Sequence, residues 1–245
     1  MDGAAVNDAL HLPGQRPQDG AAPAKAPMTS SSRYADALLW AEQLHRAQRR
    51  KGKPIPYISH LIAVSALVWE DSGTEDQAIA ALLHDAIEDA GQSHASIAAR
   101  FGEAVAAIVS DCTDTAADWN GGEKEPWLLR KTRFLDRLDQ LSDTSLLVIA
   151  ADKAHNASDM VLDARRDASL WDRFSAGLEG SAWYLLRVHQ HLSHRLPQSR
   201  SVAQLGDAVR EIMASEPYRR LVPQGIAPAV WAAGYTARMP SPANS

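Results

Sequence analysis

Several features that would place this chain in other classes of protein are missing from its sequence. Only one of its 245 residues is a cysteine, Cys112, so an internal disulfide is excluded and a reducing compartment is expected. No run of eighteen or more apolar residues exists, which argues against a membrane-spanning helix. The net charge of −5 argues against general nucleic-acid binding. The N-terminal stretch also lacks the pattern of a signal peptide, so we expect a cytoplasmic protein.

A further absence concerns secondary structure. The sequence shows no alternation of apolar and polar residues that would indicate β-strands. Apolar residues make up 45% of the chain and charged residues 22%, which is typical of a globular protein. Apolar residues recur at helical spacing through nearly all of the middle of the chain. We therefore predict an all-α fold, a bundle of roughly eight to ten helices.

Composition divides the chain into three parts. Residues 1–32 are rich in Ala, Pro, Gly and Ser and predict a disordered tail, residues 33–215 predict one helical domain, and residues 216–245 predict an irregular C-terminal tail. Ser93 and either Asp143 or Thr144 are expected to cap the helices that follow them. Within the domain, helices are predicted at residues 34–48, 61–69, 75–89, 93–100, 103–113, from 127 onward, 143–164, 171–194 and 201–214.

The stretch ALLHDAIEDAG, residues 80–90, places His84 and Asp85 beside the apolar face of a predicted helix. His60 begins another helix, and Asp152 lies on the apolar face of a third. Buried polar groups of this kind are costly unless they are paired. Two imidazoles and two carboxylates that converge from three helices would bind a divalent metal. This donor set suits Mn²⁺, and after it Fe²⁺ or Mg²⁺, better than a closed tetrahedral zinc site. The sequence therefore predicts a metal site between helices.

Two further carboxylates, Glu88 and Asp89, follow one helical turn after His84 and Asp85. This spacing places both near the rim of the predicted metal site, where one can orient or deprotonate an attacking water and the other can hold its partner. The alternative is a solvated acidic helix end.

Two clusters of basic residues interrupt an otherwise acidic sequence. The first lies just before His60, and the second surrounds Trp127. Basic clusters beside a metal suit a small polyphosphate, and arginine can also lie flat on a purine ring. Ordinary solvated helix faces are the alternative for both. The clusters consist of Arg46, Arg49, Arg50, Lys51 and Lys53, and of Lys124, Arg130, Lys131 and Arg133.

Taken in order and spacing, four segments resemble the HD-type hydrolase domain of RelA/SpoT proteins, and more closely the stand-alone small alarmone hydrolases, the type that includes the metazoan SpoT homologue. The resemblance covers about residues 33–195. Histidine and aspartate at this spacing would by themselves indicate only an HD phosphohydrolase, whereas the basic segment and HDAIED narrow the resemblance to alarmone hydrolysis. The four segments are HRAQRRKGKPIPYISH, ALLHDAIED, FGEAVAAIVSDCTD and AADKAHN.

The resemblance implies an HD-domain helical bundle that removes the 3′-pyrophosphate from guanosine tetra- or pentaphosphate (ppGpp or pppGpp) with Mn²⁺, releasing GDP or GTP. By position it implies Arg50 and Lys51 at the nucleobase and Asn156 at the nucleoside. Lys131 of the second basic cluster is a further candidate substrate contact, and so is Tyr184, which with Trp183 resembles an aromatic pair near the family's pocket; helix packing is the alternative for Tyr184. The resemblance also implies the metal ligands, which are His60, His84, Asp85 and Asp152, and the water-activating pair, which is Glu88 and Asp89.

Two departures from the family pattern bear on the substrate. The chain has Asp152-Lys153-Ala154-His155-Asn156 where the family often has Asp-Arg-Leu-His-Asn, and the connector KGKPIP differs from common versions. The guanine alarmone (ppGpp) is the favoured substrate, and the adenine alarmone (ppApp) stays open. Two other functions also stay open: a general HD-type nucleotide phosphohydrolase, and a non-catalytic alarmone-binding or antitoxin partner of an alarmone synthetase. The oligomeric state is not predicted. His45 is expected to be structural, and His155 to support the ligands or the packing.

Overall fold

The computed structural model describes residues 29–115, 122 and 124–239. Within these residues it holds thirteen α-helices, one 3-10 helix and no strand beyond an isolated bridge, so the predicted all-α fold is confirmed. The elements are α1 (Ser32–His45), α2 (Ile58–Glu70), α3 (Glu75–Leu83), α4 (Ala86–Ala90), α5 (His94–Phe101), α6 (Glu103–Cys112), α7 (Trp127–Leu138), α8 (Asp143–Ala164), η1 (Ala168–Arg173), α9 (Gly177–Arg195), α10 (Arg200–Ala214), α11 (Glu216–Leu221), α12 (Pro228–Ala233) and α13 (Tyr235–Arg238).

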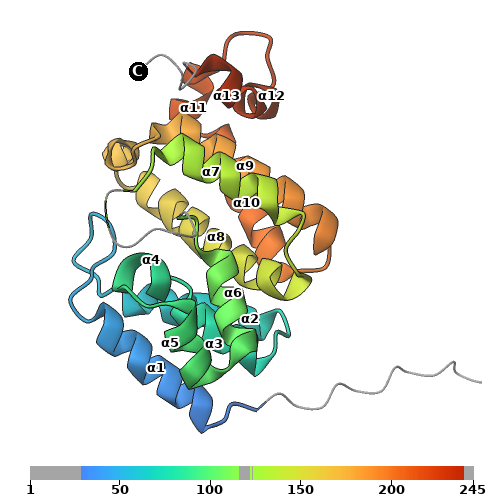
Figure 1. Cartoon of the computed structure of the whole chain (residues 1–245). Helices are drawn as coiled ribbons and strands as arrows, with labels where there is room; N and C mark the ends of the chain where they lie inside the picture. Colours follow the sequence, from blue (N-terminus) through green and yellow to red (C-terminus); the bar gives the residue numbers. More distant parts are fainter. Residues whose placement is uncertain (1–28, 116–121, 123, 240–245) are drawn as a thin grey trace, which may run out of the picture.

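The helices form two hydrophobic cores that share α8 (Figure 1). The first core gathers buried residues of α1 to α6, in the lower part of the view, and the second gathers those of α7 to α13 above. Ala151 of α8 belongs to the first core, whereas Ala150 and Ala154 belong to the second. Asp152 follows Ala151, so this carboxylate lies where the two cores meet.

Local sequence explains where several helices begin. Thr74 caps α3 and Ser93 caps α5, each with a reciprocal capping box, and the second cap was predicted. The cap of α8 is Ser142, whose hydroxyl accepts a hydrogen bond from the backbone of Ser145, and not Asp143 or Thr144 as predicted. Ser142 has the extended backbone that a cap requires, so the helix begins one residue after it, at Asp143.

The helix predicted over residues 75–89 is broken at His84 and Asp85. The carbonyl of Ala81 accepts a hydrogen bond from His84 Nδ1 at 2.8 Å, which satisfies an acceptor in the last turn of α3. Asp85 leaves the helical conformation (φ −99°, ψ 2°) before α4 starts. The break points both side chains toward the boundary between the cores, and it explains in part why the structure has more helices than predicted.

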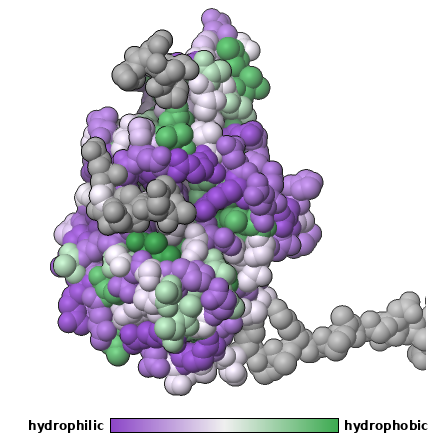
Figure 2. Space-filling view, viewed as in Figure 1, coloured by the Kyte–Doolittle hydropathy of each residue, from purple (hydrophilic) through white to green (hydrophobic). Residues whose placement is uncertain are grey.

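The C-terminal region differs from the predicted irregular tail. Residues 216–238 form α11, α12 and α13, and Tyr218 and Tyr235 are buried in the second core. Apolar side chains also stay exposed here, among them Val230, and Figure 2 shows hydrophobic residues gathered at this end of a mostly hydrophilic face. Most of the predicted N-terminal tail, residues 1–28, lies outside the described residues, and Ser31 caps α1.

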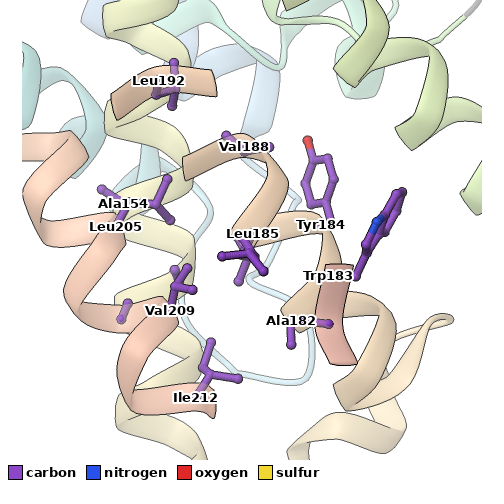
Figure 3. Packing of buried hydrophobic residues seen from close by; sticks show 14 of the residues in the cluster. Ala154, Ala182, Trp183, Tyr184, Leu185, Val188, Leu192, Leu205, Val209 and Ile212 are labelled. Carbon is purple, nitrogen blue, oxygen red and sulfur yellow. The ribbon is translucent and has the colours of Figure 1, made fainter. Parts of the chain in front are cut away.

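Helices α8, α9 and α10 form the centre of the second core. Leu185 and Val188 of α9 lie on the side of α10, where they meet Leu205 and Val209 (Figure 3). Helix α9 begins at Gly177, later than the predicted start at residue 171, because η1 occupies residues 168–173. None of the helices in the described ranges is long and apolar enough to cross a membrane.

Candidate active site

Four ionisable side chains from separate elements converge where the two cores meet. His60 lies in the first turn of α2, His84 and Asp85 lie at the break between α3 and α4, and Asp152 lies on α8. His84 Nε2 is 3.0 Å from Asp85 Oδ2 and 3.5 Å from Asp152 Oδ1. His60 Nε2 is 3.2 Å from the same Asp152 oxygen and 3.9 Å from Asp85 Oδ2. The structure thus brings together all four residues predicted as metal ligands.

Hydrogen bonds at Nδ1 determine which nitrogen each imidazole presents to this cluster. His84 Nδ1 donates to the carbonyl of Ala81, and His60 Nδ1 lies 2.9 Å from Nδ1 of His155. Burial lowers the pKa of His155 to about 4, so the neutral ring of His155 can accept a hydrogen bond from the N–H at His60 Nδ1. Both Nε2 atoms are buried and have no hydrogen-bond partner among the described residues. This arrangement fits two metal-ligating nitrogens.

The two carboxylates of the cluster are held by neighbouring side chains. The Tyr57 hydroxyl donates to Asp85 Oδ2 at 2.5 Å. Lys153 Nζ donates to Asp152 Oδ2 and Asn156 Nδ2 donates to Asp152 Oδ1, each at 2.5 Å. Such partners orient metal ligands. Tyr57 is not among the predicted site residues, although it lies three positions before His60 in the basic motif.

Opposite charges at short range keep the two carboxylates of the cluster ionised. Burial opposes the negative charge of Asp85 and Asp152, but His84 and Lys153, respectively, hold the pKa of these carboxyls below the ordinary value. Burial also lowers the pKa of His60, whereas for His84 the two aspartates outweigh burial and raise the pKa. Two carboxylates and two imidazoles in one buried place form a donor set that fits a divalent cation.

The predicted water-activating pair, Glu88 and Asp89, lies on α4 directly after the cluster. The backbone N–H of Asp89 donates to the carbonyl of Asp85 at 2.8 Å, so the predicted helical turn between these residues forms. Lys124 Nζ is 2.8 Å from Glu88 Oε1 and 3.4 Å from Asp89 Oδ1. Gln48 Nε2 donates to Asp89 Oδ2 at 2.9 Å. Each carboxylate is therefore partly buried and held by a side chain from a distant segment.

A cavity of about 260 Å³ adjoins the cluster and mixes charged walls with an apolar surface. Asn156 connects the two, because its amide donates to Asp152 while its oxygen accepts from Arg50 Nη2 at 3.0 Å. Three predicted substrate contacts, Arg50, Lys51 and Asn156, line this cavity. Its full lining is Gln48, Arg49, Arg50, Lys51, Lys53, Tyr57, Asp89, Asn156, Asp159, Met160, Asp163, Leu170 and Phe174.

Two carboxylates of the cavity, Asp159 and Asp163, were not predicted. Arg50 Nη2 and Lys53 Nζ lie 2.9 and 2.7 Å from the oxygens of Asp159, and Lys53 Nζ lies 2.6 Å from Asp163. A signal for them exists in the sequence, since they follow Asp152 by seven and eleven positions and so share its helix face. The sequence gives no signal that Arg50 and Lys53 pair with these carboxylates, because the pairing joins segments about a hundred residues apart.

Lys131 and Tyr184 do not line the cavity. Lys131 Nζ lies 4.8 Å from the centre of the Tyr184 ring and forms an ion pair with Asp114, which also binds Arg130. Tyr184 projects from the side of α9 away from α10 (Figure 3), and its buried hydroxyl has no hydrogen-bond partner among the described residues. Its ring also contacts Trp127, as the packing alternative would require. Arg130 and Lys131 thus form a second cationic group around Asp114. Arg130 Nη1 lies 3.9 Å from Glu88 Oε1 and so connects this group to the acidic pair.

The fold and the four converging side chains define the class of this protein, an α-helical domain built around one candidate metal centre. A family model described as HD domain matches residues 37–170, and the chain belongs to this family.

The relatives refine this assignment and confirm the predicted resemblance. The Xenopus tropicalis protein named guanosine-3′,5′-bis(diphosphate) 3′-pyrophosphohydrolase MESH1 is 33% identical over 128 residues, which are 51% of this chain and 68% of the relative. The human protein of the same name is 31% identical over 135 residues, or 54% of this chain and 72% of the relative. A solved structure described as a metazoan ortholog of SpoT that hydrolyzes ppGpp has a TM-score of 0.59 at 26% identity and covers 76% of this chain and 98% of that one.

Proposed function

We propose that this protein is a Mn²⁺-dependent 3′-pyrophosphohydrolase that converts ppGpp to GDP and pyrophosphate, and pppGpp to GTP and pyrophosphate. The observation that carries the proposal is the convergence of His60, His84, Asp85 and Asp152 directly beside a cavity lined by Arg50 and Lys51. A metal cluster that adjoins a cavity with several basic side chains in its wall suits a nucleotide with several phosphates. The activity named for the MESH1 relatives supports the same substrate.

The four converging residues would hold the cation. When bound, a divalent metal lowers the pKa of a water molecule and neutralises charge on a phosphoryl oxygen. Tyr57 would keep Asp85 in place, and His155 would keep the proton of His60 on Nδ1 so that Nε2 faces the cation. Imidazole and carboxylate ligands together favour Mn²⁺ over Mg²⁺, which prefers oxygen ligands.

Glu88, with Asp89 beside it, would orient the water and take its proton. The water oxygen attacks the phosphorus attached to the ribose 3′ oxygen. The bond between this phosphorus and the 3′ oxygen then breaks. The 3′ oxygen takes up a proton and becomes a hydroxyl, while pyrophosphate departs with the oxygen of the water. Burial raises the pKa of Glu88, which suits a carboxylate that must accept a proton near neutral pH.

The cavity would bind the nucleoside. Arg50, held 5.9 Å from the centre of the Tyr57 ring, and Lys51, 5.3 Å from the centre of the Phe174 ring, would border the base, and Asn156 would contact the nucleoside. Lys131 and Tyr184 do not line the cavity, and their role as substrate contacts beside α7 stays a prediction. Guanine preference and activity on ppApp both belong to this proposal as outcomes to be measured.

The experiment is incubation of purified protein with ppGpp or ppApp, with Mn²⁺ or with a chelator, and resolution of the products by ion exchange. We expect GDP and pyrophosphate to appear only with metal, and the ratio of the two rates gives the base preference. Release of phosphate from 5′ positions would instead favour a general HD-type nucleotide phosphohydrolase. Tight binding of ppGpp without turnover, in protein that holds metal, would favour an alarmone-binding partner.

Two further expectations accompany this function and stay predictions. An alarmone hydrolase can act as the antitoxin of an alarmone synthetase, and co-expression with a synthetase would test this pairing by rescue of growth. Fractionation of cells would test the expected cytoplasmic location.

A further inference from the structure

Lys124 is a basic residue at the site whose role is not explained by substrate binding alone. It lies just before α7, on the segment that joins α6 to α7, whereas Glu88 and Asp89 lie on α4. Its ammonium group reaches both carboxylates, at 2.8 Å from Glu88 Oε1 and 3.4 Å from Asp89 Oδ1. Lys124 therefore connects the segment before α7 to the acidic pair on α4.

The other charged groups near Glu88 do not offer the same contact. Arg130 Nη1 lies 3.9 Å from Glu88 Oε1, but the same nitrogen forms a shorter ion pair with Asp114. Asp114 and Asp85 are negative and act against ionisation of Glu88. Among the described residues, Lys124 makes the closest cationic contact to Glu88.

The electrostatic balance at Glu88 agrees with this geometry. Burial and the nearby Asp114 raise the pKa of Glu88, whereas the hydrogen bond from Lys124 lowers it. Burial opposes the charge of Lys124, but Glu88 and Asp89 outweigh it and raise the pKa of the ammonium group, so Lys124 stays protonated. The side chains are 32% exposed for Lys124 and 19% for Glu88, so solvent screens the pair only in part.

We propose that Lys124 is a positioning residue that keeps Glu88 ionised and holds its Oε1 atom in place, so that Glu88 can accept the proton of the attacking water near neutral pH. This inference rests on the proposed hydrolase function. An opposite charge within hydrogen-bond distance lowers the pKa of a carboxyl by about one to three units, and loss of that charge should reverse the effect. The acidic limb of the pH profile therefore depends on Lys124.

The test is the pH profile of kcat for Mn²⁺-dependent ppGpp hydrolysis in wild type, Lys124→Met and Lys124→Arg. We expect Lys124→Met to move the acidic limb upward by about one pH unit, with kcat recovering toward the wild-type plateau at higher pH, because the carboxylate then forms without help. Lys124→Arg should restore most of the wild-type profile. As a control, Arg220→Gln removes an exposed cation on α11, where Arg220 pairs with Glu216, and should leave the limb in place.

Two results would overturn the inference: an acidic limb that does not move in Lys124→Met, or a kcat that falls by the same factor at every pH, as a purely structural defect would produce. A second measurement does not depend on turnover. Carboxyl ¹³C NMR of Mg²⁺-loaded protein, with the Glu88 signal assigned through Glu88→Gln, should show a higher pKa for Glu88 in Lys124→Met than in wild type.

The two measurements separate this inference from the proposed function. Wild-type protein that does not hydrolyse ppGpp, together with the expected NMR shift, would reject the proposed function and support the contact between Lys124 and Glu88. Active wild-type protein with an unchanged Glu88 pKa in Lys124→Met would reject the inference alone.

Discussion

The two ends of the candidate site share Asn156 but are built in different ways. At the metal end, His60, His84 and Asp152 have side chains between 1% and 8% exposed, and Asp85 is 19% exposed. At the cavity end, the ion pairs of Arg50 and Lys53 with the carboxylates of α8 involve side chains between 14% and 29% exposed. Three of the four predicted ligands are thus nearly closed to water, whereas the cavity end meets the solvent that a nucleotide has to displace.

This difference in burial indicates how each end of the site responds when one of its side chains is substituted. Removing one partner from a buried charge cluster leaves the others uncompensated, and this is strongly unfavourable. An ion pair in contact with solvent contributes much less, because water and salt replace the lost partner. We therefore expect large, all-or-none effects at the metal end and graded effects on substrate affinity at the cavity end.

The largest effect is expected for Asp85→Ala. The substitution removes one predicted ligand and the acceptor of the Tyr57 hydroxyl. Loss of the metal should lower turnover of ppGpp by about 10⁴-fold or more, because metal catalysis supplies several kcal/mol of transition-state stabilisation. Metal content by plasma emission spectroscopy and the rate of GDP formation check the result. Retained stoichiometric Mn²⁺ would show that Asp85 is not a ligand.

Glu88→Gln separates chemistry from metal binding. Loss of a general base lowers kcat by about 10²- to 10⁴-fold, while the four ligands stay in place. We expect near-normal metal content in this variant and in the double variant Glu88→Gln, Asp89→Asn, with kcat lower still in the second. Normal turnover of the double variant would exclude the proposed role of the pair.

Tyr57→Phe removes one hydroxyl and keeps the ring. Its hydrogen bond to Asp85 orients a predicted ligand, and loss of such a partner weakens metal affinity by about 10- to 100-fold. Titration of activity with Mn²⁺ should therefore shift to higher concentration, with kcat recovering at saturating metal. Tyr34→Phe is a matched control, because the Tyr34 hydroxyl bonds to Ser65 on α2, outside the cluster. An equal shift in both variants would contradict a specific role for Tyr57.

The smallest effect is expected at the cavity end. Asp159→Asn keeps the shape of the side chain but removes the charge that pairs with Arg50 and Lys53. We expect KM for ppGpp to rise by only a few-fold, because partly exposed pairs contribute roughly 1 kcal/mol or less, and kcat to change little. A loss of kcat as large as that of Glu88→Gln would show that the two ends do not differ in the way that burial suggests.

The sequence by itself determined the all-α class, most helix ranges and the chemical character of the site. Helical spacing of apolar residues and caps such as Ser93 act over a few positions, and such local signals can be read without the fold. The convergence of His60, His84, Asp85 and Asp152 was also predicted, because each lies beside the apolar face of a helix and needs a buried partner.

Only the tertiary structure decided the break at His84, the contact of Tyr57 with Asp85 and the pairing of Lys53 with Asp159 and Asp163. It also decided that residues 216–238 form three helices on the second core. The physical reason is the same in each case. These features depend on side chains that are distant in the sequence, and the direction in which a side chain points is fixed only when helices from both cores pack against α8.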